Sequence, residues 1–395
     1  MHTQYDYIIA GAGCAGLSLL NSMMQHAFFS NKKILLIDKA QKNDNDKTWC
    51  FWEQQPGLFE DIVYHRWQQI DFFSNQFSAR FNLKPYEYKL IRSIDLYTTV
   101  LNKAALFSNI DIVYDEVVQV SSYNNRPFIK THNGIQVGAS YIFNSLLPAN
   151  WMQKARQQKE YLLLQHFAGW WIETSQDAFD AQTATFMDFK LGYENSNSFM
   201  YVLPVTKNKA LVEYTVFSEE ILTPKQYADA IEAYIHSTLK IKEYTVLQKE
   251  WGVIPMTSYT FPAGKNNVIN IGTAGGQTKG SSGFTFQFIQ KHIKKITEAL
   301  LAGKNPLQAR NLFEKRFKLY DDILLNVLIN NKLDAGSFFS LLFKKNSVNT
   351  ILRFLDNETN FKQELNVMRT VPINLFLHAA CKELLLNNSI FRQRT

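Results

Sequence analysis

The sequence predicts an α/β fold in which a parallel β-sheet is interleaved with an antiparallel β-sheet and followed by a helical C-terminal region. The first 40 residues alternate strand, glycine turn, helix and strand, and such a βαβ unit requires a parallel sheet. Residues 165–217 hold consecutive apolar runs without an intervening helix, which is typical of antiparallel strands. From residue 307 to the end, the pattern indicates helices throughout.

The composition indicates a globular protein with a sizeable core. The chain has 395 residues, enough for two or three domains, and its 46% hydrophobic and 19% charged residues exclude a disordered chain. Aromatic residues make up 14%, which suits either an aromatic core or the pocket of a large apolar ligand. Three scattered cysteines without a CxxC pair favour a reduced, cytoplasmic protein over a disulfide-stapled one.

The individual elements follow from the apolar periodicity. Strands are expected at 7–10 and 33–37 around a helix from Leu17 to about Phe29; residues 41–90 read as irregular and 91–107 as a helix. Short strands are expected within 110–120 and 127–143, and antiparallel strands at 167–172, 184–187, 199–203 and 210–217. Helices are expected at 223–239 and 285–301, the second after a strand and glycine turn at 267–283.

These elements divide the chain into three regions. We expect residues 1–40, 91–150 and 251–305 to form a discontinuous parallel-sheet domain that binds a dinucleotide. Residues 41–90 and 151–250 would form the antiparallel β domain that holds the substrate, and residues 306–395 a helical region.

A glycine-rich turn follows the first strand and opens the first helix. Its sequence is Gly11-Ala12-Gly13-Cys14-Ala15-Gly16, and Asp38 ends the next strand at about the expected 20-residue spacing. In such a turn Gly11 allows the tight bend, Gly13 allows a pyrophosphate to approach the backbone, and Gly16 lets the helix pack on the strand. A bound pyrophosphate would lie at the positive end of the helix, beside Ala12 and Ala15, and Asp38 would accept a ribose hydroxyl. The position of the motif near the N-terminus resembles flavoproteins that bind FAD.

A second glycine segment occurs late in the chain. Gly272, Gly275 and Gly276 follow a strand and precede a helix, as in FAD enzymes whose late helix N-terminus faces the flavin, although a purely structural loop remains an alternative. The chain has no Gly-Asp or Asp-Gly dipeptide, which argues against a flavin hydroxylase. Arg92, just before a helix, resembles the FAD-contacting arginine of related flavoproteins, and Val118 is a further cofactor-contact candidate.

Three long motifs resemble the lycopene beta-cyclases. Residues 46–52 read Asp-Lys-Thr-Trp-Cys-Phe-Trp, residues 272–286 match the second flavin segment of that family, and residues 353–359 read Arg-Phe-Leu-Asp-Asn-Glu-Thr. The resemblance implies a glutathione-reductase-type FAD-binding fold and cyclisation of lycopene with reduced FAD, kept reduced by NADPH, without net electron transfer. Its aromatic residues imply a substrate pocket, which we expect to include Trp49, Trp52, Phe186 and Phe284.

Glu213 is the predicted general acid. In a strand, Glu213 shares a face with Leu211, Thr215 and Phe217, so its carboxyl would be desolvated and its pKa raised. The family places its essential acid in a Glu-Asp-Thr or Glu-Glu-Thr triplet here; this chain has Tyr214 at the second position, which leaves Glu213 as the candidate within the triplet. From the strand pattern alone, an exposed edge-strand Glu213 is the alternative. Asp188 is the second catalytic candidate and is expected to lie near this acid.

A basic segment suggests which kind of surface the protein binds. Residues 291–353 contain 12 Lys and Arg against 5 Asp and Glu, which equals the net charge of +7 of the whole chain. A membrane surface, nucleic acid or an ordinary solvated face would each suit this charge, but no nucleic-acid motif accompanies it. We expect a peripheral protein on the cytoplasmic face of the membrane, docked through Lys344 and Lys345 beside the apolar residues Phe338, Phe339, Leu341, Leu342 and Phe343. No signal peptide, membrane span, metal site or obligate protein partner is expected.

Two other functions remain open at this level. One is a flavin oxidoreductase that acts on an isoprenoid and consumes NADPH stoichiometrically. The other is a carotenoid- or flavin-binding carrier, which would need no buried acid. The sequence leaves open whether one or both ends of the substrate are cyclised and which base takes the final proton.

Overall fold

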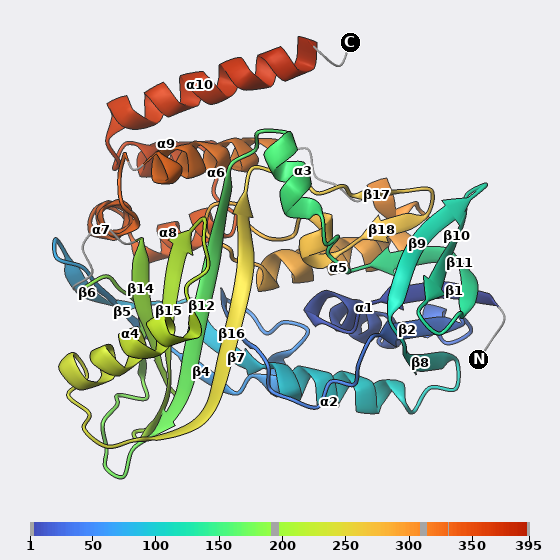
Figure 1. The fold of residues 1–395 in the computed structure, drawn as a ribbon, viewed down its shortest axis with the longest axis horizontal. Helices are drawn as coiled ribbons and strands as arrows, with labels where there is room; N and C mark the ends of the chain where they lie inside the picture. The colour runs from blue at the N-terminus through green and yellow to red at the C-terminus, as the bar shows by residue number, and fades with distance from the viewer. Residues whose placement is uncertain (1–3, 191–196, 309–313, 331, 393–395) are drawn as a thin grey trace.

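The computed structural model describes residues 4–190, 197–308, 314–330 and 332–392 (Figure 1). The strands are β1 Gln4–Ala10, β2 Ile34–Asp38, β3 Thr48–Glu53, β4 His65–Trp67, β5 Gln69–Phe73, β6 Ser78–Asn82, β7 Glu87–Arg92, β8 Ile110–Tyr114, β9 Val117–Tyr123, β10 Arg126–Thr131, β11 Gln136–Asn144, β12 Leu162–Glu173, β13 Thr183–Asp188, β14 Ser198–Pro204, β15 Lys209–Ser218, β16 Thr245–Thr257, β17 Gly264–Lys265 and β18 Val268–Asn270. The α-helices are α1 Cys14–Met24, α2 Ser93–Ala104, α3 Trp151–Gln157, α4 Pro224–Ser237, α5 Phe286–Leu301, α6 Glu314–Ile329, α7 Ala335–Lys345, α8 Val348–Leu355, α9 Phe361–Met368 and α10 Ile373–Arg392. The expected helicity of residues 309–313 lies outside the described residues.

The predicted parallel sheet is present. Its strands lie in the order β17-β18-β11-β1-β2-β8, and β1 pairs in parallel with both β2 and β11. Helices α1, α2 and α5 cover one face through apolar side chains such as Leu17, Val100 and Ile293. The β9–β10–β11 meander contributes Ile129 and Val137 to the core on the other face. Both faces are buried, as parallel strands require.

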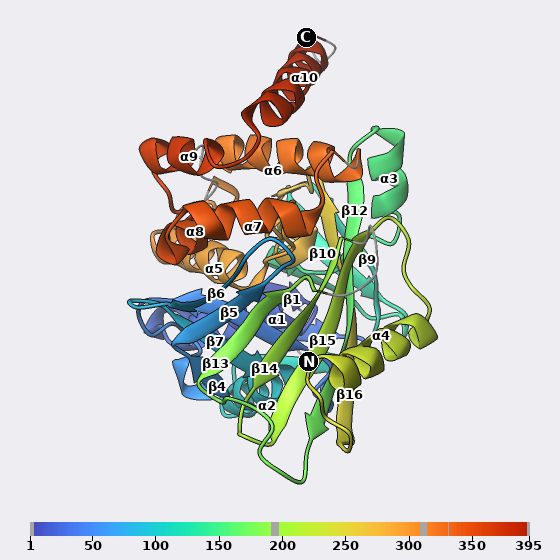
Figure 2. The same cartoon turned by 90° about the vertical axis from the view of Figure 1, so that its left-hand side faces the viewer.

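The predicted antiparallel sheet is also present, with seven strands in the order β16-β12-β15-β14-β13-β5-β6, of which one pair, β13 and β5, is parallel. Helix α4 covers one face, where Tyr227 and Ile231 pack on Val212. The other face packs against α7, α8 and a three-stranded sheet, β3-β7-β4 (Figure 2). The two faces of β15 therefore belong to different cores.

Residues 41–90 are not irregular as expected, because they contain β3 to β7. These strands have three to six residues, and β5 joins β13 while β3 joins β7, so their partners are distant in sequence. Strand β16 crosses the expected boundary at residue 251 and extends the antiparallel sheet to Thr257. Helix α1 begins at Cys14 rather than Leu17, because the tight glycine turn starts the helix at once.

The helical C-terminal region stacks at one end of the molecule, with α10 outermost (Figures 1 and 2). Helix α7 does not form the expected membrane-docking surface. Phe339 stacks on Phe189 with ring centroids 6.1 Å apart, and Phe343 stacks on Phe72 at 4.7 Å, so the aromatic face of α7 belongs to the core. Lys344 and Lys345 are exposed at the end of α7. Within the part of the chain that the structure describes, no helix combines the length and apolarity needed to cross a bilayer.

Candidate active site

The glycine turn between β1 and α1 has the geometry of a dinucleotide-binding loop. Gly11 has φ +101°, and a Cβ there would lie 2.1 Å from the Ser145 Oγ. A Cβ on Gly16 would lie 1.9 Å from the Gly11 carbonyl oxygen, so only glycine allows this helix–strand contact. A Cβ on Gly13, by contrast, would meet no atom within 4 Å. Gly13 also caps α1 without a side-chain hydrogen bond, and the first turn holds no acid, which leaves the positive helix end open to an anion.

Asp38 closes the same loop at the end of β2. Its Oδ2 accepts a hydrogen bond of 2.7 Å from the Ala12 N–H, and its Oδ1 forms an ion pair of 3.2 Å with Lys42. An ionised carboxylate has about four acceptor positions, so Asp38 retains capacity for a ribose hydroxyl. Ala15 lies within the first turn of α1, beside the second glycine segment.

The second glycine segment lies against α1. It forms a 3₁₀ turn, Gly272–Gly275, in which a Cβ on Gly272 would lie 2.9 Å from the Ala15 Cβ. Gly276 ends the turn at φ +81°. Two buried polar atoms beyond it, Gln277 Oε1 and Ser282 Oγ, have no hydrogen-bond partner within the described residues. The two glycine segments are thus in contact, and the unpaired polar atoms follow the second segment within a few residues. Both features suit a site that binds a dinucleotide.

Arg92 and Val118 are the two remaining residues that we expect to contact the cofactor. The Arg92 guanidinium forms two 2.7 Å hydrogen bonds with Asp95 and stacks over the Tyr64 ring at 3.9 Å, so its charge already has partners. Val118 lies on β9 with an exposed side chain. Any contact of Val118 with a ligand would therefore involve its backbone or its exposed side chain.

Strand β3, from the motif at 46–52, separates two cores. Trp49 packs against Tyr97 and Phe286 on the side of the parallel sheet, with centroids 6.3 and 6.4 Å apart. Trp52 lies in the other core, 4.9 Å from Phe284 and 6.1 Å from Phe186. Trp49 and Trp52 point to opposite faces because they are three residues apart in a strand, so the four aromatic residues do not line one common space.

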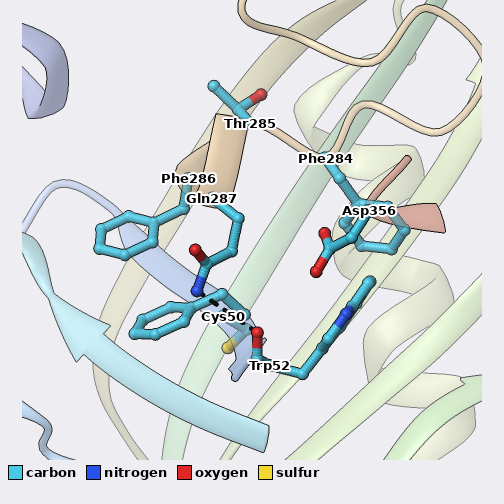
Figure 3. Close-up of a pocket in the computed structure, with 8 residues that line it drawn as sticks. Cys50, Trp52, Phe284, Thr285, Phe286, Gln287 and Asp356 are labelled. Carbon is cyan, nitrogen blue, oxygen red and sulfur yellow. Dashed lines mark hydrogen bonds between the residues drawn. The ribbon is translucent and has the colours of Figure 1, made fainter. Parts of the chain in front are cut away.

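Two of the remaining three aromatic residues, Trp52 and Phe284, border a small pocket (Figure 3). Trp52, Phe284 and Asp356 line it, together with Cys50, Phe51, Thr285, Phe286 and Gln287. Its volume is about 10 Å³, space for one water molecule, so a carotenoid end group fits only if these rings move. A larger pocket of about 360 Å³, lined by Arg80, Asp180 and Asp188 among others, lies on the α4 side of the antiparallel sheet.

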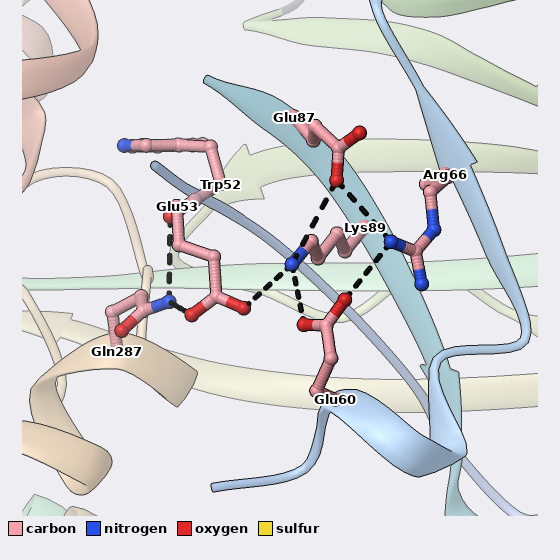
Figure 4. Close-up of polar contacts among 7 residues, drawn as sticks. All are labelled: Trp52, Glu53, Glu60, Arg66, Glu87, Lys89 and Gln287. Carbon is pink, nitrogen blue, oxygen red and sulfur yellow. Dashed lines mark hydrogen bonds and ion pairs between the residues drawn. The ribbon is translucent and has the colours of Figure 1, made fainter. Parts of the chain in front are cut away.

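An ion-pair network holds the three-stranded sheet in place (Figure 4). The buried Lys89 ammonium lies 2.9 Å from the Glu53 carboxylate and 2.6 Å from that of Glu60. Gln287, in the first turn of α5, donates to the Trp52 carbonyl and to Glu53, both at 3.3 Å. The helix that follows the second glycine segment is thereby tied to the strand that carries the pocket aromatics.

Glu213 lies on the expected face of β15. Leu211 and Phe217 belong to the core between the antiparallel sheet and α7, whereas Tyr214 packs on the opposite face against Tyr227. The half-buried Glu213 accepts a hydrogen bond of 3.0 Å from the Thr215 hydroxyl. Desolvation, reinforced by the nearby charge of Glu250, raises the pKa of Glu213 well above its usual value. A raised pKa favours the protonated carboxyl, which is the form that a general acid requires.

A second carboxyl, Glu250 of β16, was not predicted from the sequence. Gly169 of β12 pairs with Glu213 on one side and with Glu250 on the other, so the two acids flank a residue without a side chain. The Thr48 hydroxyl donates a 2.6 Å hydrogen bond to Glu250 Oε2. Burial raises the pKa of Glu250, while the hydrogen bond from Thr48 lowers it. The only local signal is a glutamate next to an apolar run, and the strand pairing alone brings it to the site.

Asp188 is not near Glu213, which contradicts the expectation. It accepts hydrogen bonds of 2.8 Å from the Tyr234 hydroxyl and from the Lys190 N–H, and Tyr234 belongs to α4 on the other face of the sheet. The register of β13 against both neighbours shifts between Thr185 and Asp188. This irregularity breaks the two-residue alternation that would have placed Asp188 on the face of Phe186.

Comparison with solved structures shows the same fold in flavoproteins. A geranylgeranyl bacteriochlorophyll reductase-like protein from Thermoplasma acidophilum superposes with a TM-score of 0.64 at 13% identity, covering 92% of this chain and 96% of its own. A flavoprotein/dehydrogenase from Cytophaga hutchinsonii also gives 0.64, at 12% identity and 97% and 100% coverage. A Klebsiella pneumoniae protein solved with FAD gives 0.58, at 10% identity and 94% and 100% coverage.

Comparison of the sequence itself gives the family. No curated protein sequence matches the chain. A family profile described as lycopene cyclase protein matches residues 6–381, which include both glycine segments and the strands of Glu213 and Glu250. The chain therefore belongs to the lycopene cyclase family.

Proposed function

We propose that the protein is a lycopene beta-cyclase that binds FAD and converts the linear ends of lycopene into β-rings. The observation that carries this proposal is the Glu213 carboxyl, which lies on an apolar face of β15 and whose pKa is raised by desolvation and by Glu250. Alkene protonation needs a proton donor in dry, apolar surroundings. The family supplies the substrate class.

The cofactor would be bound by the two glycine segments. The pyrophosphate would lie at the N-terminus of α1 beside Gly13, with Ala12, Ala15 and Asp38 around it. The turn from Gly272 to Gly276 would hold the flavin end. Bound in its reduced form, with NADPH as reductant, FAD would supply negative charge that stabilises a passing cation, without net electron transfer.

The reaction begins at Glu213. Its proton goes to C2 of the terminal C1=C2 double bond and leaves a tertiary cation at C1. The C5=C6 double bond then closes a six-membered ring by bonding C6 to C1, which moves the cation to C5. Loss of the proton at C6 restores a C5=C6 double bond. Every atom of the substrate is retained, so the reaction is an isomerisation.

Aromatic rings around the acid support such a cation. Tyr88 and Tyr201 interact electrostatically with Glu213, and both flank Phe186, with centroids 5.5 and 6.0 Å away. Ring faces stabilise a nearby positive charge by about 0.5–2 kcal/mol each. Desolvation raises the pKa of both tyrosines, so they stay neutral rings rather than phenolate bases.

The test is the Glu213→Gln variant expressed in lycopene-accumulating cells. Glutamine keeps the shape and removes the transferable proton, so we expect β-carotene formation to fall by at least about 100-fold while FAD stays bound. The control is Asp188→Asn, a buried acid on the other face, which should retain most of the activity. Wild-type amounts of β-carotene from Glu213→Gln would overturn the proposal. Stoichiometric NADPH consumption would instead indicate an oxidoreductase.

We further propose that the protein docks on an anionic membrane surface through α9 and α10, because lycopene resides in lipid. Exposed apolar side chains gather there, namely Phe361, Leu365, Ile373, Leu377 and Leu384. Exposed Lys362, Arg369 and Lys382 lie on the same two helices or just beyond them. Apolar residues beside basic ones favour anionic lipid.

A further inference from the structure

The proposed reaction consumes one proton and releases another. Glu213 supplies that proton, and the structure places a second carboxyl, Glu250, beside it. Glu213 and Glu250 lie on β15 and β16, each paired with Gly169 of the strand between them. A side chain at residue 169 would intrude here, because its Cβ would lie 3.1 Å from the Glu250 Cγ and 3.5 Å from the Glu213 Cβ. The absence of that side chain leaves the two carboxyls facing one space.

Glu250 has the surroundings of an ionised carboxylate, although it is only 5% exposed. Thr48 donates to its Oε2, and Lys47 is near enough to act on it electrostatically. Its other oxygen, Oε1, is buried without a hydrogen-bond partner within the described residues. An unpaired buried acceptor is costly. Two donors lie beside it, the Trp171 indole N–H and a protonated Glu213 carboxyl, and both lower the pKa of Glu250.

We propose that Glu213 and Glu250 form a two-carboxyl unit that holds a single proton, in which Glu250 carries the charge and Glu213 the transferable hydrogen. This inference rests on the proposed function. The proton leaves Glu213 for C2 of the substrate, and the proton lost from C6 returns to the unit, so protons balance over one turnover. Glu250 is a positioning residue, since it acts through Glu213.

The groups that face the unit fit a single negative charge. Cys50 of β3, Tyr88 of β7 and Tyr201 of β14 interact electrostatically with Glu213, and desolvation raises the pKa of each. All three are therefore neutral at neutral pH. Lys47 is the cation near Glu250, and the Trp171 indole of β12 also lowers the pKa of Glu250 as a hydrogen-bond donor. The charge difference between the two acids therefore arises from Thr48, Trp171 and Lys47, together with the hydrogen bond between the carboxyls themselves.

The unit can be observed without substrate, by the infrared carbonyl band of protonated carboxyls in the purified full-length protein. We expect one band at neutral pH that is absent in Glu213→Gln. In Glu250→Gln the repelling charge is gone, so the band should persist but titrate at least one pH unit lower than in the wild type. The alkaline limb of the cyclisation rate should move in the same direction. The matched control is Glu383→Gln, a buried glutamate between α6 and α10, which should leave the midpoint unchanged.

An unchanged midpoint in Glu250→Gln, or the absence of a Glu213 band in the wild type, would overturn the inference. If Glu250→Gln does not fold, Thr48→Val keeps both carboxyls and removes only the hydrogen bond to Glu250. Loss of this hydrogen bond should raise the lower of the two titration midpoints of the carboxyl pair. An unchanged midpoint would count against the two-carboxyl unit. A unit that titrates as expected in a protein that forms no β-carotene would instead refute the proposed function alone.

Discussion

At the residue scale, two glycines of the first turn have different roles, one in folding and the other in ligand binding. Gly16 touches backbone, so its role is structural, whereas Gly13 faces open space at the N-terminus of α1. Only Gly13 is therefore positioned to let a ligand approach the backbone.

We expect Gly13→Val to lose FAD without unfolding. Its φ of −86° suits any residue, and replacing glycine at an N-cap costs about 1 kcal/mol of unfolding free energy at most. The new side chain would fill the space for the pyrophosphate, so flavin affinity should fall by more than about 100-fold in a fluorescence titration. Gly16→Ala is the counterpart: its Cβ would lie 1.9 Å from the Gly11 oxygen, so the midpoint of thermal unfolding should drop. Full flavin content in Gly13→Val would contradict the pyrophosphate assignment.

At the element scale, the C-terminal helices divide into buried and exposed groups. Helix α7 fills the core, with Phe338 only 6% exposed, while Leu377 of α10 is 57% exposed. Helix α10 is anchored from its inner side by Glu383, which accepts hydrogen bonds from Tyr161 and Asn326. Ile373, Leu377 and Leu384 are spaced by four and seven residues and share one helix face.

We expect Leu377→Asp to weaken membrane binding without loss of stability. The side chain contributes nothing to the described core, so the unfolding free energy should change by no more than about 0.5 kcal/mol. Insertion of one leucine into lipid stabilises binding by about 1.5–3 kcal/mol, so cosedimentation with anionic vesicles should fall at least about tenfold. Phe338→Ala should have the opposite effects: the unfolding free energy should fall by about 3–5 kcal/mol, while vesicle binding should stay unchanged. Unchanged vesicle binding of Leu377→Asp would rule out this docking surface.

At the scale of the whole molecule, buried carboxyls other than Glu213 and Glu250 tie stability to pH. Desolvation raises the pKa of Asp356 to about 7, against the lowering effect of Lys291, and that of Asp322 also to about 7. In the unfolded chain an aspartate loses its proton near pH 4. Between about pH 4 and 7 the native state therefore binds more protons than the unfolded state, and stability falls as pH rises.

We expect Asp356→Asn to flatten this dependence. Each such carboxyl contributes about 1.4 kcal/mol per pH unit across the window, so the variant should match the wild type at pH 4 and exceed it in stability at pH 8. Thermal unfolding at both values measures the difference. An exposed control, Asp177→Asn, should leave the slope as it is. Equal slopes in Asp356→Asn and the wild type would show that this carboxyl is ionised in the native state.

The sequence by itself determined the features that depend on neighbours along the chain. The glycine turn at the start of α1, the βαβ unit and the face of Glu213 were predicted correctly apart from the first residue of the helix, because a tight turn and the two-residue period of a strand are local properties.

Only the tertiary structure decided what depends on strand pairing and packing. Glu250 reaches Glu213 because two distant strands flank Gly169, and Asp188 leaves that face because a register shift breaks the alternation in β13. The aromatic face of α7 was assigned to the wrong surroundings for a related reason. An apolar side chain has the same pattern in sequence whether it lines a pocket, meets lipid or fills a core, and only the elements packed against it distinguish the three.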